Sequence, residues 1–104
     1  MKNIAVDAEG FLIDKNQWNR QVAIDLALSD GIELNDLHWQ VIDFIQDFYE
    51  SYEVFPLIRQ IRAHIQKQKS YESIGSIELY EAFPHGVLKQ GAKFAGLVKP
   101  PGCI

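Results

Sequence analysis

The sequence predicts a mainly helical α+β fold, in which an N-terminal β-hairpin packs on a bundle of about five helices and a mobile C-terminal arm follows. Three observations carry this prediction. Apolar residues recur at intervals of three and four through most of residues 17–95. Two short apolar runs flank an acidic, glycine-containing connection at residues 7–10. Residues 97–104 contain two prolines and a glycine, which interrupt a helix.

The composition is that of one globular domain, with 104 residues, 47% hydrophobic and 23% charged. We expect residues 1–96 to form this domain and residues 97–104 to form the arm. No apolar run approaches the roughly 18 residues of a membrane span, and the N-terminus lacks the basic-then-apolar layout of a signal peptide. We therefore expect a cytoplasmic protein. A single cysteine excludes an internal disulfide and suits a reducing compartment.

Charge is distributed unevenly along the chain. The net charge is −4, and all 14 acidic residues precede residue 84, whereas Lys89, Lys93 and Lys99 follow it. The acidic body weighs against general nucleic-acid binding, because it repels phosphates. The basic tail fits an acidic cleft in a protein partner, but composition alone favours the simpler explanation that the three lysines form a solvated helix face.

The predicted hairpin consists of residues 3–6 and 11–13, joined through residues 7–10. An isolated hairpin is marginally stable in water, so we expect it to pack on the helices that follow.

Helices are expected over residues 17–29, 37–52, 56–68, 76–83 and 87–95. The second has the clearest signals, because Asn35 suits an N-cap and Asp36 the positive helix start. Aromatic and aliphatic residues at helical spacing mark it as the central core helix. Ser76 suits the cap of the fourth helix, and Gly96 should close the fifth in a left-handed conformation.

The sequence contains few conventional active-site motifs. The sequence has no glycine-rich phosphate loop, no paired cysteines for zinc and no histidine pair at ligand spacing, so no metal or organic cofactor is expected. His38 fits packing or capping near a helix start, and His64 fits the surface. His85 fits a turn, and the less favoured alternative is that it approaches the arm and polarises the thiol. A DNA-binding helix-turn-helix is an alternative that the acidic body weakens.

Cys103 is the candidate reactive residue. Its chemistry must be intermolecular, and an idle thiol is the alternative. The neighbouring terminal carboxylate disfavours the thiolate, so we expect activation by a partner. Residues 97–103 can extend roughly 20 Å, which suits docking. Pro100 and Pro101 limit the conformations lost on binding, and Gly102 lets another backbone approach the sulfur.

Short motifs are spread over nearly the whole chain. They are His38-Trp39, Asp47-Phe48-Tyr49, Pro56 with Arg59, Tyr80 with Phe83-Pro84, Lys89-Gln90, Ala95-Gly96-Leu97, Lys99-Pro100 and Gly102-Cys103. In these residues and their spacing the sequence resembles the DsrC/TusE family. The resemblance implies a small helical protein with a β-hairpin and a mobile C-terminal arm, whose penultimate cysteine, here Cys103, carries sulfur.

Two branches of the family bear on function. TusE-type members take a persulfide from the TusBCD complex and pass it to the tRNA thiouridylase MnmA, for 2-thiolation of the wobble uridine. DsrC-type members present sulfur to dissimilatory sulfite reductase. Two-cysteine DsrC proteins have their second cysteine where this chain has Ala92, so the single thiol favours the TusE-type sulfurtransferase. Val87 and Val98 stand where the family often has proline, and Gln46 where it often has arginine.

The resemblance implies protein partners: a TusBCD-like donor and an MnmA-like acceptor, with tRNA reached only indirectly and neither DNA nor membrane involved. The alternative is a DsrC-like docking subunit or regulator of a sulfite-reductase-type system, without obligatory sulfur transfer. The expected site residues are Cys103 as the catalytic carrier, Lys99, Pro100, Pro101 and Gly102 as arm-positioning residues, and Lys89, Lys93 and Arg59 as candidates for partner docking.

Overall fold

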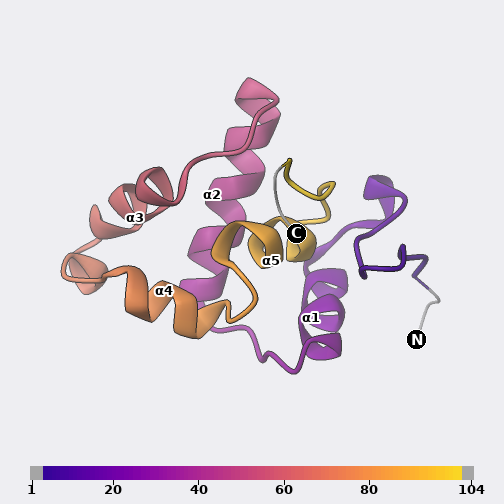
Figure 1. Ribbon diagram of the computed structural model, residues 1–104, viewed down its shortest axis with the longest axis horizontal. Helices are drawn as coiled ribbons and strands as arrows, with labels where there is room; N and C mark the ends of the chain where they lie inside the picture. The colour runs from indigo at the N-terminus through magenta and orange to yellow at the C-terminus, as the bar shows by residue number, and fades with distance from the viewer. Residues whose placement is uncertain (1–3, 102–104) are drawn as a thin grey trace.

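The computed structural model describes residues 4–101 as a helical body (Figure 1). Within these residues it has five α-helices: α1 Arg20–Ser29, α2 Asp36–Tyr52, α3 Ile58–Gln66, α4 Ser76–Ala82 and α5 Val87–Phe94. Two short 3₁₀ turns accompany the helices: η1 Lys15–Gln17 precedes α1, and η2 Lys69–Tyr71 lies between α3 and α4. Among the described helices, none combines the length and apolarity that crossing a membrane requires.

Helix α2 is central, as predicted. It packs against α3 and α5, and α5 also contacts α1 and α4 (Figure 1). The core lies between these helices, and burial of each large apolar side chain contributes roughly 1.5–3 kcal/mol. The largest fully buried apolar side chains include Phe83, Phe94, Ile42, Ile45, Ile61, Ile65 and Leu79.

The predicted N-terminal β-hairpin is wrong. Residues 4–101 contain no strand, and the only pairing near the N-terminus is an isolated antiparallel bridge between Val6 and Leu12. The Asp7 carboxylate accepts hydrogen bonds from the backbone N–H groups of Glu9 (2.9 Å) and Phe11 (3.0 Å), which ties the segment into a tight turn. Phe11 and its neighbour Leu12 are both buried, so the period of two that a half-buried strand needs is lost.

The predicted start of α2 is confirmed. The Asn35 side chain accepts a hydrogen bond from the His38 backbone N–H (3.2 Å), and the His38 ring Nδ1 accepts one from the Asn35 N–H (3.0 Å). The His38 ring is buried, and its Nε2 lies 2.7 Å from the Ala82 carbonyl oxygen. The prediction that His38 caps and packs is therefore also confirmed.

Helix α1 begins later than predicted. The Asn19 side chain accepts a hydrogen bond from the Val22 N–H (2.9 Å) and is the N-cap, so the helix starts at Arg20 rather than near residue 17. The preceding turn η1 has its own cap, Asp14. Trp18 consequently lies between the two elements, where its indole reaches another part of the chain.

Helices α3 and α4 differ from prediction at their first turns. Helix α3 starts at Ile58 because buried Pro56 lies outside it and Leu57 is the N-cap, whose N–H donates to the Gln60 side chain (2.7 Å). Helix α4 includes Ser76 as its first residue, so Ser76 is not the cap. Gly75 holds that position instead, and its N–H donates to the Glu78 carboxylate (2.9 Å).

Candidate functional site

The candidate site is the segment that leaves α5. Of its predicted residues, Gly102 and Cys103 lie outside the described residues, whereas residues 96–101, here called the arm root, are described. The predicted division into a domain of residues 1–96 and an arm of residues 97–104 stays a prediction. The arm root is the described segment that precedes Cys103, so its geometry determines where the chain leaves the body.

The exit from α5 is a Schellman motif. The Leu97 N–H donates to the Ala92 carbonyl (3.0 Å) and the Gly96 N–H donates to the Lys93 carbonyl (3.2 Å). Gly96 has φ +76°, a left-handed conformation that glycine adopts without steric cost, as the sequence predicted. The backbone thus turns off the helix in one defined direction.

Two side chains from distant elements satisfy the last carbonyls of α5. The Trp18 indole Nε1 donates to the Phe94 carbonyl (2.7 Å), and the Gln46 Nε2 donates to the Ala95 carbonyl (2.8 Å). A Cβ added at Gly96 would approach Trp18 Cδ1 to 2.5 Å, so the indole packs directly on the exit. Gln46, noted above as a departure from the family pattern, therefore binds the end of α5, the helix that precedes the arm.

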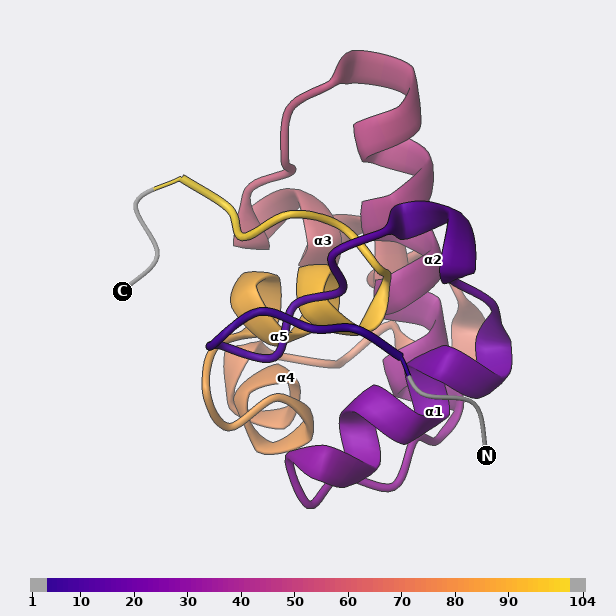
Figure 2. The same cartoon turned by 90° about the vertical axis from the view of Figure 1, so that its right-hand side faces the viewer.

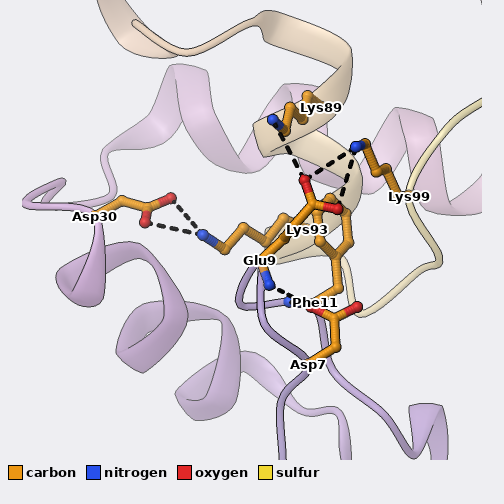
Figure 3. A network of polar contacts seen from close by, with 7 residues as sticks. All are labelled: Asp7, Glu9, Phe11, Asp30, Lys89, Lys93 and Lys99. Atoms are coloured by element: carbon orange, nitrogen blue, oxygen red, sulfur yellow. Dashed lines mark hydrogen bonds and ion pairs between the residues drawn. The ribbon is translucent and has the colours of Figure 1, made fainter. Parts of the chain in front are cut away.

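An ion cluster holds the arm root against the N-terminal turn (Figure 3). Lys99 Nζ donates to both oxygens of the Glu9 carboxylate, at 2.9 and 3.1 Å. Lys89 Nζ lies 3.8 Å from the same carboxylate. Figure 2 shows the N-terminal segment lying across α5 beside the arm root. Such partly exposed pairs are worth about 0–1 kcal/mol each, so they orient the segment more than they stabilise the fold.

Lys93 is in a more enclosed pair. Its Nζ contacts both Asp30 oxygens, at 2.9 and 3.0 Å, and the two side chains are only 12% and 19% exposed. The Gln90 amide also donates to Asp30 (3.2 Å), and Gln90 is itself buried. The pair joins α5 to the end of α1, which indicates a structural role. Its predicted part in partner docking stays a prediction.

The proline pair is divided between the body and solvent. Pro100 is fully buried, whereas Pro101 is exposed. A groove of about 400 Å³ beside them is lined by residues of the arm root, the end of α2, the segment that follows α2, and α5. Val98, another departure from the family pattern, is 61% exposed at this groove. Arg59 is exposed on α3, a different element from the lysine cluster.

Sequence reasoning missed Glu9, Trp18 and Gln46 as partners of the arm root. Trp18 carried a usable signal, because a buried indole N–H needs an acceptor. Glu9 carried none, since its partner is 90 residues away. No group of three or more potential metal-ligating side chains occurs in the described part of the chain.

The fold and the site define a small helical protein that anchors a cysteine-bearing C-terminal segment on its last helix. The chain belongs to the family described as DsrC like protein, whose model matches residues 1–104. It is similar to the sulfurtransferases TusE of Escherichia coli (strain K12) and Salmonella typhimurium (strain LT2). Each is 39% identical over 103 residues, covering 99% of this chain and 94% of the relative.

Solved structures agree with this family membership. The crystal structure of the oxidized gamma-subunit of the dissimilatory sulfite reductase (DsrC) from Archaeoglobus fulgidus is 33% identical with a TM-score of 0.87, covering 99% of this chain and 94% of that one. The NMR structure of Allochromatium vinosum DsrC is 41% identical with a TM-score of 0.81, covering 99% and 92%. The helical fold described here is therefore that of the family.

Proposed function

We propose that this protein accepts sulfur as a persulfide on Cys103 and passes it to an acceptor cysteine of a protein partner. The protein is a sulfurtransferase of a sulfur relay, as its relatives of 39% identity over nearly the whole chain indicate. The observation that supports the proposed site is that the chain contains one cysteine, Cys103, which lies two residues after the arm root. The proposed end point is 2-thiolation of the wobble uridine of tRNA.

The chemistry is two sulfur exchanges. The Cys103 thiolate attacks the outer sulfur of the donor persulfide, the S–S bond of the donor breaks, and the donor cysteine leaves as a thiolate. The acceptor thiolate then attacks the outer sulfur on Cys103, and Cys103 leaves as a thiolate. No net oxidation occurs in either step, so no resident cofactor is needed. With one cysteine in the chain, an internal disulfide cannot compete.

The proposed partners are a TusBCD-like donor and an MnmA-like tRNA thiouridylase as acceptor, with tRNA reached only through the acceptor. We place this relay in the cytoplasm. The second candidate is a docking subunit or regulator of a sulfite-reductase-type system, because the similar protein from Archaeoglobus fulgidus is a gamma-subunit of the dissimilatory sulfite reductase. The single cysteine favours the relay, because that second role does not require the thiol.

Sulfur loading tests the proposal. The protein is incubated with a cysteine desulfurase, the relay donors and labelled cysteine, and its intact mass is measured. We expect one added sulfur atom on the wild-type chain and none on a Cys103→Ser variant. A wild-type chain that gains no sulfur, or a Cys103→Ser variant that gains it equally, overturns the proposal. Normal function of Cys103→Ser in cells, with binding lost on removal of residues 97–104, would establish the docking subunit instead.

A further inference from the structure

Four basic side chains follow one another along α3 and η2, with no acidic residue between Glu53 and Glu72. They are Arg59, Arg62, Lys67 and Lys69, called here the basic strip. This stretch has a formal charge of +4, so the rest of the chain carries −8. Within residues 4–101 no ion pair joins the basic strip to a carboxylate, although four other basic side chains are paired. The charge of the strip is therefore left for an external anion.

The basic strip follows one exposed face of α3. Arg59 and Lys67 are exposed and eight residues apart, which places them on the same side of the helix, about 12 Å apart along its axis. Exposed Ala63 lies midway between them. Arg62 lies at the edge of the face, where it is half-buried and donates to the Ser76 hydroxyl (3.1 Å). Figure 1 shows α3 on the outside of the molecule, at the opposite end from the N-terminal segment.

The composition of this face distinguishes a phosphate ligand from a protein surface. Protein interfaces have an apolar, fully buried centre, whereas nucleic-acid interfaces are more polar and strongly positive. None of the exposed large apolar side chains in the described part of the chain lies between residues 58 and 71. The face instead presents cations separated by alanine and glutamine, without a carboxylate. It therefore matches the phosphate groups of a nucleic acid better than the surface of a protein.

We infer that the basic strip binds the phosphate backbone of the tRNA held by the acceptor, an inference that rests on the proposed function. The relay meets RNA at the acceptor step, and the wobble uridine is still reached only through the acceptor. Residues 97–103 extend at most roughly 20 Å, whereas the molecule measures 39 × 28 × 24 Å. However the arm is placed, the acceptor–tRNA complex therefore lies alongside the body when it takes sulfur. The negative charge of the remaining surface repels RNA, which leaves the basic strip as the face that turns toward it.

Substitutions on α3 test the sign of this interaction. The probe is the acceptor–tRNA complex, and every chain carries Cys103→Ser so that no sulfur moves. We expect Arg59→Gln/Lys67→Gln to weaken binding by about tenfold and to lower the slope of log K against log salt concentration by about 2. Ala63→Glu should weaken binding several-fold, and Ala63→Lys should strengthen it. Lys15→Gln is the control and should leave binding unchanged, because Lys15 is exposed in η1, in the segment at the opposite end of the molecule from α3 (Figure 1).

Two further measurements identify the ligand. Affinity for the acceptor without tRNA should be the same for all of these chains. With p-azidophenylalanine in place of Ala63, irradiation of the complex should form an adduct with the tRNA. An adduct with the acceptor polypeptide alone would assign the basic strip to a protein contact and overturn the inference. A DNA duplex that displaces the acceptor–tRNA complex at equal concentration would overturn it too, because the strip would then be a DNA-binding surface.

Sulfur transfer separates this inference from the proposed function. Because the basic strip acts at the acceptor step, an Ala63→Glu chain that retains Cys103 should take sulfur from the donor at the wild-type rate but pass it to the acceptor–tRNA complex more slowly. If the wild-type chain loads and transfers sulfur while the α3 variants bind the complex as it does, the inference is wrong and the proposed function stands. If the α3 variants lose binding but no chain gains sulfur, the strip binds RNA and the proposed function fails.

Discussion

Lys93→Met separates the two roles considered for Lys93. The methionine keeps most of the apolar stem but removes the ammonium group that contacts both Asp30 oxygens at 2.9 and 3.0 Å. Asp30 then keeps the Gln90 amide as a donor but loses its cation in a setting where its side chain is 19% exposed. A structural pair predicts lost stability, whereas a residue used only for docking predicts none.

The magnitude follows from the burial of the pair. Breaking a fully buried pair costs about 3–5 kcal/mol, and an exposed pair contributes about 0–1 kcal/mol. With 12% and 19% side-chain exposure, the Lys93–Asp30 pair lies closer to the first case but keeps contact with water. We therefore expect Lys93→Met to lower the free energy of unfolding by about 2 kcal/mol. For a domain of this size that loss lowers the Tm by roughly 10 °C.

Urea unfolding followed by circular dichroism measures this loss. Lys67→Met is the control, because Lys67 is exposed at the end of α3, and we expect it to change stability by less than about 0.5 kcal/mol. A Lys93→Met/Asp30→Asn double variant should recover part of the loss, since the unpaired carboxylate is gone. If Lys93→Met unfolds at the same urea concentration as Lys67→Met, the structural role is refuted and docking remains the explanation for Lys93.

Two further predictions concern the arm exit and pH. Gly96→Ala should cost about 1–2 kcal/mol of stability for the left-handed backbone and a further amount for the displacement of Trp18. Gly31→Ala is the control, because Gly31 has φ +75° with open space around it and should lose only the backbone part. Equal losses of the two variants in urea unfolding would contradict the packing argument. Burial lowers the pKa of His38 below its ordinary value of 6.5, so the unfolded state binds more protons and stability should fall as the pH drops below about 6.5. His38→Asn should flatten that fall between about pH 7 and pH 5, and an NMR titration that places the His38 pKa at or above 6.5 would refute the argument.

Local patterns predicted the helices well and the N-terminal segment poorly. The Asn35 cap and the left-handed Gly96 follow from residue types within one or two turns, so the sequence was sufficient for both. The hairpin failed because the Asp7 side chain binds two backbone N–H groups of the following turn. Propensity for a strand does not include this competing local bond.

The candidate site divides in the same way. The single cysteine and the family resemblance pointed to Cys103, and family membership is established by the match over residues 1–104. The surroundings of the arm root were not predictable, because Glu9, Trp18 and Gln46 reach it from segments that are distant in the sequence. The residues that neighbour each of them in the sequence do not predict which distant group it contacts.

By itself, the sequence determined the helical character of the chain, the Asn35 cap of α2, the left-handed Gly96 after α5 and the cysteine-bearing end, because periodicity, capping and residue counts are short-range properties. Only the tertiary structure decided that the N-terminal turn lies against the arm root, that Lys93 pairs with Asp30, and that exposed apolar side chains collect around Pro100. The physical reason is that such contacts depend on how the helices pack around α2 and α5, which brings side chains together across up to 90 residues of sequence.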